Sequence, residues 1–185
     1  MKEILIPEQH YEYFDEDSEE FVYVDIDETR FTIEHSLISL SKWEGKWKKP
    51  FLKDDKTKEE MEDYIRCMTL THNVDPKVYK YIPDHIWTEI IEYIEEKQTA
   101  TWFNDALIGA QKNPREQITS EIIYFWMISL SIPIEFQKWH LSRLLTLIKV
   151  VNVKSQGTKN VDKAQAARER AKLNEARRKM YNTKG

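Results

Sequence analysis

Cysteine is almost absent from this chain of 185 residues, which contains only Cys67. A single thiol excludes an intramolecular disulfide and a cysteine-based zinc site, and a reducing cytosol is the simplest compartment. Glycine is also scarce, with four residues, so a turn-rich β-sandwich is not expected. The longest apolar tract, residues 118–134, is interrupted by Glu121 and Pro133 and is too short and too polar to span a membrane. The first residues lack the long apolar region of a signal peptide, so the sequence predicts a soluble protein.

Recognised catalytic and metal-binding patterns are missing as well. The chain has five histidines, His10, His35, His72, His85 and His140. No two of them have the helical spacing of metal ligands, and neither an HExxH nor a GxSxG motif occurs. No glycine-rich phosphate loop is present, and Cys67 has no neighbour in the sequence that would activate it. We therefore expect no metal, no cofactor and no enzymatic activity.

Charge is distributed very unevenly along the chain. Residues 1–30 contain 11 acidic and two basic side chains, a net charge of −9, whereas residues 154–185 contain 10 basic and three acidic side chains, a net charge of +7. Such a pattern indicates two surfaces with different partners, or one end that is attracted to the other end of a neighbouring copy. The alternative is two ends that are simply solvated.

The basic end raises the question of nucleic acid. Five of its cations could neutralise phosphates: Arg168, Arg170, Arg177, Arg178 and Lys179. In the basic end, Tyr181 is the only aromatic residue that could stack on a base. The rest of the chain is acidic and would repel nucleic acid. Binding to an acidic protein surface is therefore the better prediction, and nucleic acid is an unlikely partner.

The first 33 residues carry the strand signals. Residues 3–7 and 21–26 are short apolar or alternating runs separated by an acidic loop at residues 14–20, and residues 31–33 could add a third short strand. A small hairpin or meander needs a cover on its apolar side, so we expect it to pack on helices.

The remaining sequence is mostly helical in its periodicity. Apolar spacing, capping residues and prolines predict five helices, at about residues 34–49, 57–68, 85–97, 119–131 and 134–151. The second begins at a capping box, Thr57 with Glu60, and the first ends before Pro50. Residues 98–117 have no clear periodicity. Four side chains on the last two helices are expected to be buried together: Trp126, Trp139, Leu144 and Leu147.

These patterns predict a mainly α fold in one domain with appendages. An acidic β element at residues 1–33 would pack on a helical core domain at residues 34–153. Residues 154–185 would form a basic tail, which is flexible or loosely helical because it has little apolar area to bury.

The order of several segments resembles a family from tailed bacteriophages. The segments are HSLISLSKWEGKWKKPFL, YIRCMTLT, TATWF and EIIYFWMISLSIPIEFQKWHLSRLLTLIKVVN, followed by the basic ending LNEARRKMYNTKG. The resemblance extends from about residue 20 to the end of the chain and rests on segment order rather than on a catalytic motif. Proteins of this family are described as tail assembly chaperones or tail assembly proteins.

The resemblance implies a function without catalysis. A tail assembly chaperone would bind the tape-measure protein in the host cytoplasm, keep it soluble and present it to the growing tail tube. The alternative is a structural virion protein, such as a tail or head–tail connector subunit, whose C-terminal arm is ordered by neighbouring subunits. Other tail proteins and further copies of this chain are additional candidate partners.

Three tryptophans are the candidate residues for binding a helical client. Trp43, Trp47 and Trp102 lie in segments bordered by loops, where they could line an aromatic groove, and the basic tail could add electrostatic attraction. The alternative is that Trp43 and Trp47 pack on the next helix.

Overall fold

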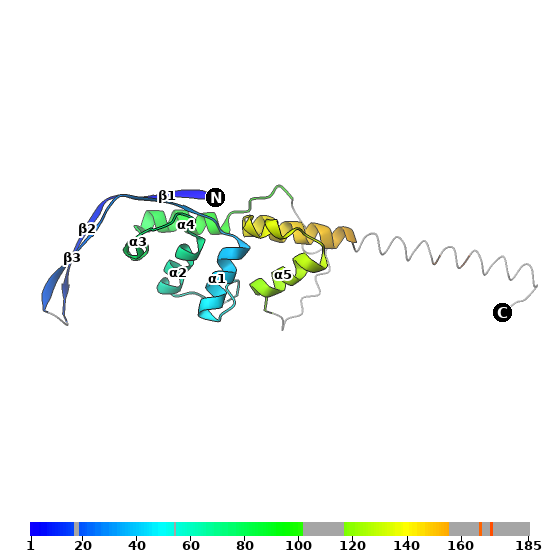
Figure 1. The fold of residues 1–185 in the computed structure, drawn as a ribbon, viewed down its shortest axis with the longest axis horizontal. Helices are drawn as coiled ribbons and strands as arrows, with labels where there is room; N and C mark the ends of the chain where they lie inside the picture. Colours follow the sequence, from blue (N-terminus) through cyan, green and yellow to red (C-terminus); the bar gives the residue numbers. More distant parts are fainter. Residues whose placement is uncertain (17–18, 54, 102–116, 156–166, 168–170, 172–185) are drawn as a thin grey trace, which may run out of the picture.

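We describe a computed structural model of the chain, which covers residues 1–16, 19–53, 55–101, 117–155, 167 and 171. Its elements follow one another along the chain as shown in Figure 1. They are β1 (Lys2–Ile6), β2 (Gln9–Asp15), β3 (Glu20–Ile26), β4 (Thr29–Ile33), α1 (Leu37–Trp47), α2 (Lys58–Met68), α3 (Pro76–Lys80), α4 (Asp84–Glu95), α5 (Ser120–Ser129) and the 3₁₀ helix η1 (Ile134–Lys138). A further helix occupies residues 141–155.

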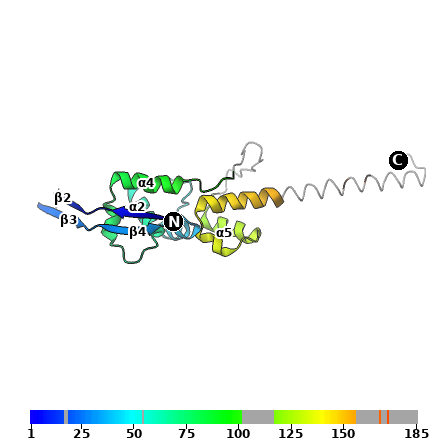
Figure 2. The ribbon, with the colours of Figure 1, turned by 90° about the horizontal axis from the view of Figure 1, so that it is seen from above.

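The four strands form a long antiparallel ribbon. β1 pairs with β4 from Lys2↔Ile33 to Ile6↔Thr29, and β2 pairs with β3 from Gln9↔Ile26 to Asp15↔Glu20. The inner half, β1 with β4, lies across the helices, and the outer half, β2 with β3, continues beyond them (Figures 1 and 2). We call the outer half the arm.

The expected mainly α class is wrong, because the chain has a mixed α/β fold with two antiparallel two-stranded sheets. The strand that the sequence did not predict is β2, which we expected to be partly an acidic loop. Most of its side chains are exposed or half-buried, so its sequence lacks the strict apolar alternation that identifies a strand. Its pairing with β3 along seven residues decides its conformation instead.

The second helix begins at the predicted capping box, whereas α1 begins at Leu37, later than the expected start near residue 34. Ser36 caps α1 in a capping box with Ser39, and Thr57 caps α2 in the predicted capping box with Glu60. α1 ends at Trp47, before Pro50, with Lys48 in the left-handed region at φ 56°. The short helix α3, which begins with Pro76 after the Asp75 cap, was not predicted.

The C-terminal helices differ from the prediction in two ways. The expected helix over residues 134–151 is divided into η1 and the helix of residues 141–155, which are joined through Trp139 and His140. Of the four side chains expected in the core here, Leu144 is buried, whereas Trp126, Trp139 and Leu147 are half-buried. Trp139 stacks instead on Phe136, with ring centroids 4.1 Å apart.

One apolar cluster joins the ribbon and the helices. Its largest fully buried side chains are Trp43, Tyr64, Phe31, Ile4, Ile6, Ile33, Leu37, Leu40, Ile65, Met68, Ile90 and Ile123. On β1 and β4 the buried residues alternate with exposed or half-buried ones, so one face of the inner ribbon is buried and the other is not. The ribbon is thus a layer of the core, and only the arm leaves it.

Candidate functional site

The two tryptophans of α1 pack on α2. Trp43 is 1% exposed, and its indole N–H donates to the carbonyl of Glu60 at 2.8 Å. Trp47 is half-buried, stacks on Trp43 at 6.1 Å between centroids and donates to Asp63 Oδ2 at 3.0 Å. In the structure, Trp43 and Trp47 therefore pack on the next helix, as in the second interpretation of the sequence. Contact between Trp43 and a partner would require α1 and α2 to separate.

Two ion pairs also link α2 to α1 and to the residues that follow α1. Lys46 pairs with Asp63 at 2.5 Å, and Lys49 pairs with Glu60, whose carboxylate is buried and also accepts from the Thr57 amide. The Lys49 ammonium and the hydrogen bond from Thr57 lower the pKa of Glu60. The other candidate binding residues, Trp102, Arg168, Arg170, Arg177, Arg178 and Lys179, lie outside the described residues.

The first exposed apolar surface is on α5. Ile123 and Met127 face the core and are at most 1% exposed, whereas Phe125 is 64% and Ile128 is 75% exposed on another side of the helix. Ile134, in the following η1, is 51% exposed. A surface helix normally has a polar outer face, so an apolar outer face indicates an interaction site. We call Phe125, Ile128 and Ile134 the α5 face.

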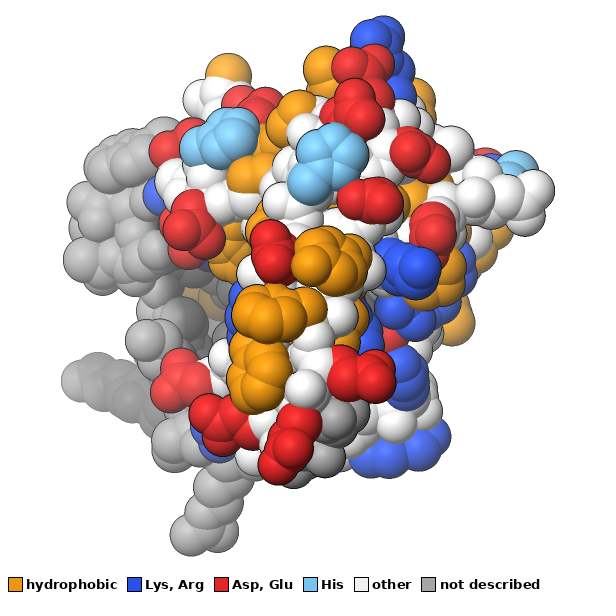
Figure 3. All heavy atoms as spheres, turned by 90° about the vertical axis from the view of Figure 1, so that its left-hand side faces the viewer, with side chains coloured by type: hydrophobic (Ala, Val, Ile, Leu, Met, Phe, Trp, Pro, Cys, Tyr) orange, Lys and Arg blue, Asp and Glu red, His pale blue; other side chains and the backbone are white. Residues whose placement is uncertain are grey.

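The second exposed apolar surface is on the arm. The β2–β3 register places Phe14 opposite Phe21, Glu12 opposite Tyr23 and His10 opposite Asp25, all on one face. The two phenylalanine rings contact edge to face at 5.3 Å, and the Tyr23 hydroxyl donates to Glu12 at 3.2 Å. We call this set of six residues the outer arm face. Figure 3 views the molecule from the side of the arm and shows a strip of apolar side chains among acidic ones.

The opposite face of the arm packs against the helical body. Tyr11 contacts Tyr81, which ends α3, with ring centroids 4.8 Å apart. Val24 is half-buried and Ile26 is 3% exposed on the same side. Among the described residues, only this face of the arm therefore contacts the helical body.

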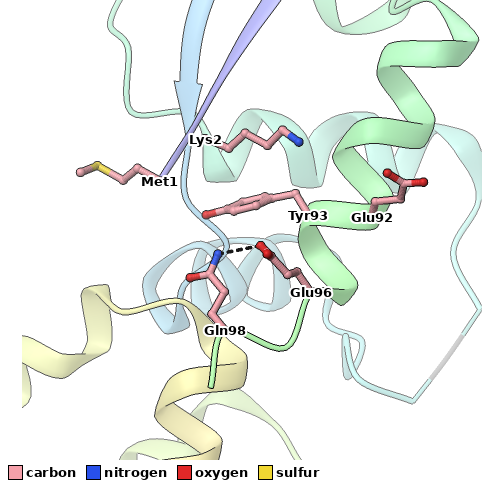
Figure 4. Close-up of a pocket in the computed structure, with 6 residues that line it drawn as sticks. All are labelled: Met1, Lys2, Glu92, Tyr93, Glu96 and Gln98. Carbon is pink, nitrogen blue, oxygen red and sulfur yellow. Dashed lines mark hydrogen bonds between the residues drawn. The ribbon is translucent and has the colours of Figure 1, made fainter. Parts of the chain in front are cut away.

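An open cleft of about 560 Å³ lies beside the start of β1. It is lined by Met1, Lys2, Glu92, Tyr93, Glu96 and Gln98 (Figure 4). Its polar groups are already occupied in part, because Lys2 pairs with Glu89 at 3.0 Å and Gln98 donates to Glu96 at 3.0 Å. None of these lining residues is a histidine, a cysteine or a serine.

A buried polar junction lies where α2, α4 and the helix of residues 141–155 meet. The Tyr64 hydroxyl is 2.6 Å from His35 Nδ1, and His140 Nε2 donates to the carbonyl of Tyr93 at 3.0 Å. The two imidazoles are 5.0 Å apart, edge to face. Burial, and secondly the neighbouring His140, lower the pKa of His35 to about 3, and burial also lowers that of His140.

This junction is built for packing rather than for proton transfer. The pKa of Tyr64 is raised chiefly by burial, so its hydroxyl stays protonated and donates a hydrogen bond to Nδ1 of neutral His35. The remaining nucleophile candidate, Cys67, has its pKa raised to about 11 by burial and by Asp63, so its thiol is protonated at neutral pH. In the part of the chain that the structure describes, every buried side-chain nitrogen or oxygen has a hydrogen-bond partner.

Comparison with known protein families, with curated proteins and with solved structures finds no match for this chain. Within the described ranges, no three His, Cys, Asp or Glu side chains are placed to hold a metal ion. Over the same residues, no helix has the length and apolar character needed to cross a membrane. The function must therefore be argued from the two exposed apolar surfaces.

Neither surface was among the candidate sites from the sequence. The signal for the α5 face was present, because apolar residues occur on most sides of residues 118–134. In the structure α5 is buried on one side only, so the apolar residues of its other side are exposed. For the outer arm face the signal was partial, because Phe21 and Tyr23 alternate along the predicted strand of residues 21–26 but the strand that forms the other half was not predicted.

The buried histidines predict acid sensitivity. A histidine whose folded pKa lies below its unfolded value binds protons mainly in the unfolded state, so the free energy of unfolding should fall as pH drops below about 6.5. His35 alone should remove about 2 kcal/mol between pH 6.5 and pH 5, and above pH 7 it should have no effect. Urea unfolding at pH 7, 6 and 5 measures this loss.

The matched controls for this experiment are His35→Gln and His72→Gln. The first should flatten the pH dependence between pH 7 and 5, and the second, at an exposed position, should leave it as in the wild type. Equal stability of the wild type at pH 7 and pH 5 would contradict the role of the buried pair.

Proposed function

We propose that this protein is a tail assembly chaperone of a tailed bacteriophage, acts in the host cytoplasm and binds the tape-measure protein without catalysis. The observation that carries the proposal is the α5 face, an uncovered apolar surface on a folded helical body. The segment order that resembles the tail assembly family supports it and includes α5 from Glu121 onward.

The α5 face suits a helical client. Phe125 and Ile128 lie on adjacent turns of one side of α5, and Ile134 follows shortly afterwards in η1. An amphipathic helix of a client could place its own apolar stripe against this row and so remove both surfaces from water. At about 25 cal/mol per Å² of apolar area, shielding of such side chains supplies most of the binding free energy expected from a contact of this kind.

The α5 face stays exposed because the folded chain uses the other side of α5 for its own core. Ile123 and Met127 pack in the main cluster, and Glu44 Oε2 accepts from the Ser120 amide at 2.7 Å, which fixes the start of the helix. The face is thus presented on an anchored helix, and binding should need little rearrangement.

Co-expression with the tape-measure protein of the same phage tests the proposal. The wild type should raise the soluble yield of the client and co-purify with it. The double variant Phe125→Asp, Ile128→Asp should lose both effects while keeping the wild-type melting temperature, because the two side chains are 64% and 75% exposed. An equal double variant, Leu52→Asp, Leu70→Asp, changes exposed apolar residues elsewhere and should still bind.

The arm favours one alternative, a structural subunit of the tail or of the head–tail connector. An extended ribbon with exposed aromatic side chains is a form in which neighbouring subunits can contact one another. Purified virions distinguish the two functions, because a chaperone should be absent or present in traces, whereas a subunit should be present in stoichiometric amounts. Presence at many copies, together with no effect on the client, would replace the chaperone proposal with this alternative.

A further inference from the structure

The outer arm face is exposed, and no element that the structure describes packs on its aromatic side chains. Its three aromatic side chains, Phe14, Phe21 and Tyr23, are 51%, 59% and 68% exposed. Two strands alone are only marginally stable in water, and here only one face of the pair rests on the body. A partner that covers the aromatic row would therefore both bind to the arm and stabilise it.

The charge around this row selects the chemistry of the partner. Residues 9–16 and 19–26, the described part of the arm and its turn, contain six acidic side chains and neither lysine nor arginine. Acidic groups flank the strip of apolar side chains in Figure 3. The partner should thus be cationic, with some apolar side chains to set against the aromatic rings.

The chain contains a segment with this chemistry. Residues 154–185 have a net charge of +7, and Leu173, Met180 and Tyr181 are interspersed among the basic residues. This segment begins at the end of the helix of residues 141–155, which points away from the body on the side opposite the arm (Figure 1). A second copy can bring its basic segment to the arm directly, whereas the segment of the same copy would have to turn back along the whole molecule.

We propose that the outer arm face binds the basic segment, residues 154–185, of a second copy of this chain. The contact joins two different surfaces, so each copy offers one arm and one basic segment, and assembly continues head to tail until a ring closes. Self-association of this kind is separate from client binding at the α5 face, and it is measured on the protein alone.

Charge reversal on each side of the contact tests the proposal. One full-length variant carries Glu12→Lys, Glu16→Lys and Asp25→Lys on the arm, all at exposed positions. The other carries Arg177→Glu, Arg178→Glu and Lys179→Glu in the basic segment. Sedimentation velocity of the wild type should show species larger than 22.2 kDa that grow with protein concentration. They should dissociate between about 0.1 M and 1 M salt, because the Debye length falls from about 10 to 3 Å.

Each variant alone should associate at least about tenfold more weakly than the wild type, because three reversals bring the net charge of the described arm from −6 to 0, or that of the segment from +7 to +1. An equimolar mixture of the two should regain association, at least in pairs, because the unaltered segment of the arm variant meets the unaltered arm of the segment variant. The control Lys53→Glu, Lys58→Glu, Lys77→Glu changes the net charge by the same amount as the segment variant does, but at exposed positions of the body. It should assemble as the wild type does.

The aromatic row has its own test. Threonine keeps a high strand propensity, so Phe14→Thr, Phe21→Thr, Tyr23→Thr should preserve the ribbon while removing the apolar contact and weakening assembly. Three results would overturn the proposal: a monomeric wild type at low salt, unchanged assembly of the segment variant, or a mixture that fails to regain assembly. Crosslinking of arm to segment within a monomer would likewise show that the contact forms inside one copy.

Discussion

Replacing Trp43 by alanine should lower the free energy of unfolding by about 3–5 kcal/mol, the largest loss we expect from a single substitution in this chain. The indole is 1% exposed and contacts Trp47, Phe51 and Tyr64, with ring centroids 5.1 to 6.5 Å apart. Its removal leaves a cavity between α1 and α2 and takes the hydrogen-bond donor from the carbonyl of Glu60. Urea unfolding at pH 7 measures the loss.

Two controls separate the contributions at this site. Trp43→Phe keeps an aromatic ring but removes the N–H donor, so it should cost clearly less than the alanine variant. Trp126→Ala, at a half-buried position, should cost about 1–2 kcal/mol. Equal losses for Trp43→Ala and Trp126→Ala would contradict the structure and would favour a core centred on the C-terminal helices, as the sequence alone predicts.

Glu44→Ala should destabilise the fold by about 2–4 kcal/mol through lost hydrogen bonds rather than lost packing. The Glu44 carboxylate is 7% exposed and accepts from two amides, that of Phe51 at 2.9 Å and that of Ser120 at 2.7 Å. The Thr119 side chain makes no capping hydrogen bond to α5, so Glu44 supplies the anionic acceptor at the positive end of this helix. Without it, two buried donors have no partner.

Hydrogen exchange gives this prediction a local readout. In Glu44→Ala the amides of Phe51 and Ser120 should exchange faster, and the loss should be smaller in Glu44→Gln, which keeps one carbonyl acceptor. Glu95→Ala, at an exposed position near the end of α4, should change stability by less than about 0.5 kcal/mol. Full stability of Glu44→Ala would show that another group holds the start of α5.

The contact that Glu44 makes with Ser120 could not be predicted from the sequence, since 76 residues separate the two. The same holds for the junction of His35 with His140, which lie on segments far apart in the sequence. Local patterns describe the neighbours of a residue along one helix or strand. A hydrogen bond across the fold depends on how several elements pack, which no spacing in the chain encodes directly.

The candidate binding residues show a second kind of limit. Aromatic residues near loops were expected to line a groove, but an indole beside a loop can also turn into the core, and Trp43 does so. Conversely, Phe125 and Ile128 are large apolar residues in the tract of residues 118–134, and they are exposed. Residue type decides how much free energy burial would contribute, and the arrangement of neighbouring elements decides whether burial occurs.

The sequence by itself determined what is local or additive along the chain: the capping box at Thr57, the end of α1 before Pro50, the strand Glu20–Ile26, and the opposed charges of the two ends. These follow from hydrogen bonds between near neighbours, from backbone sterics and from summed charge. Only the tertiary structure decided that residues 9–15 form a strand, that the ribbon extends beyond the body, and that one face of α5 is left without a cover. Those features depend on backbone pairing and on the limited area of one core, which only the packed chain defines.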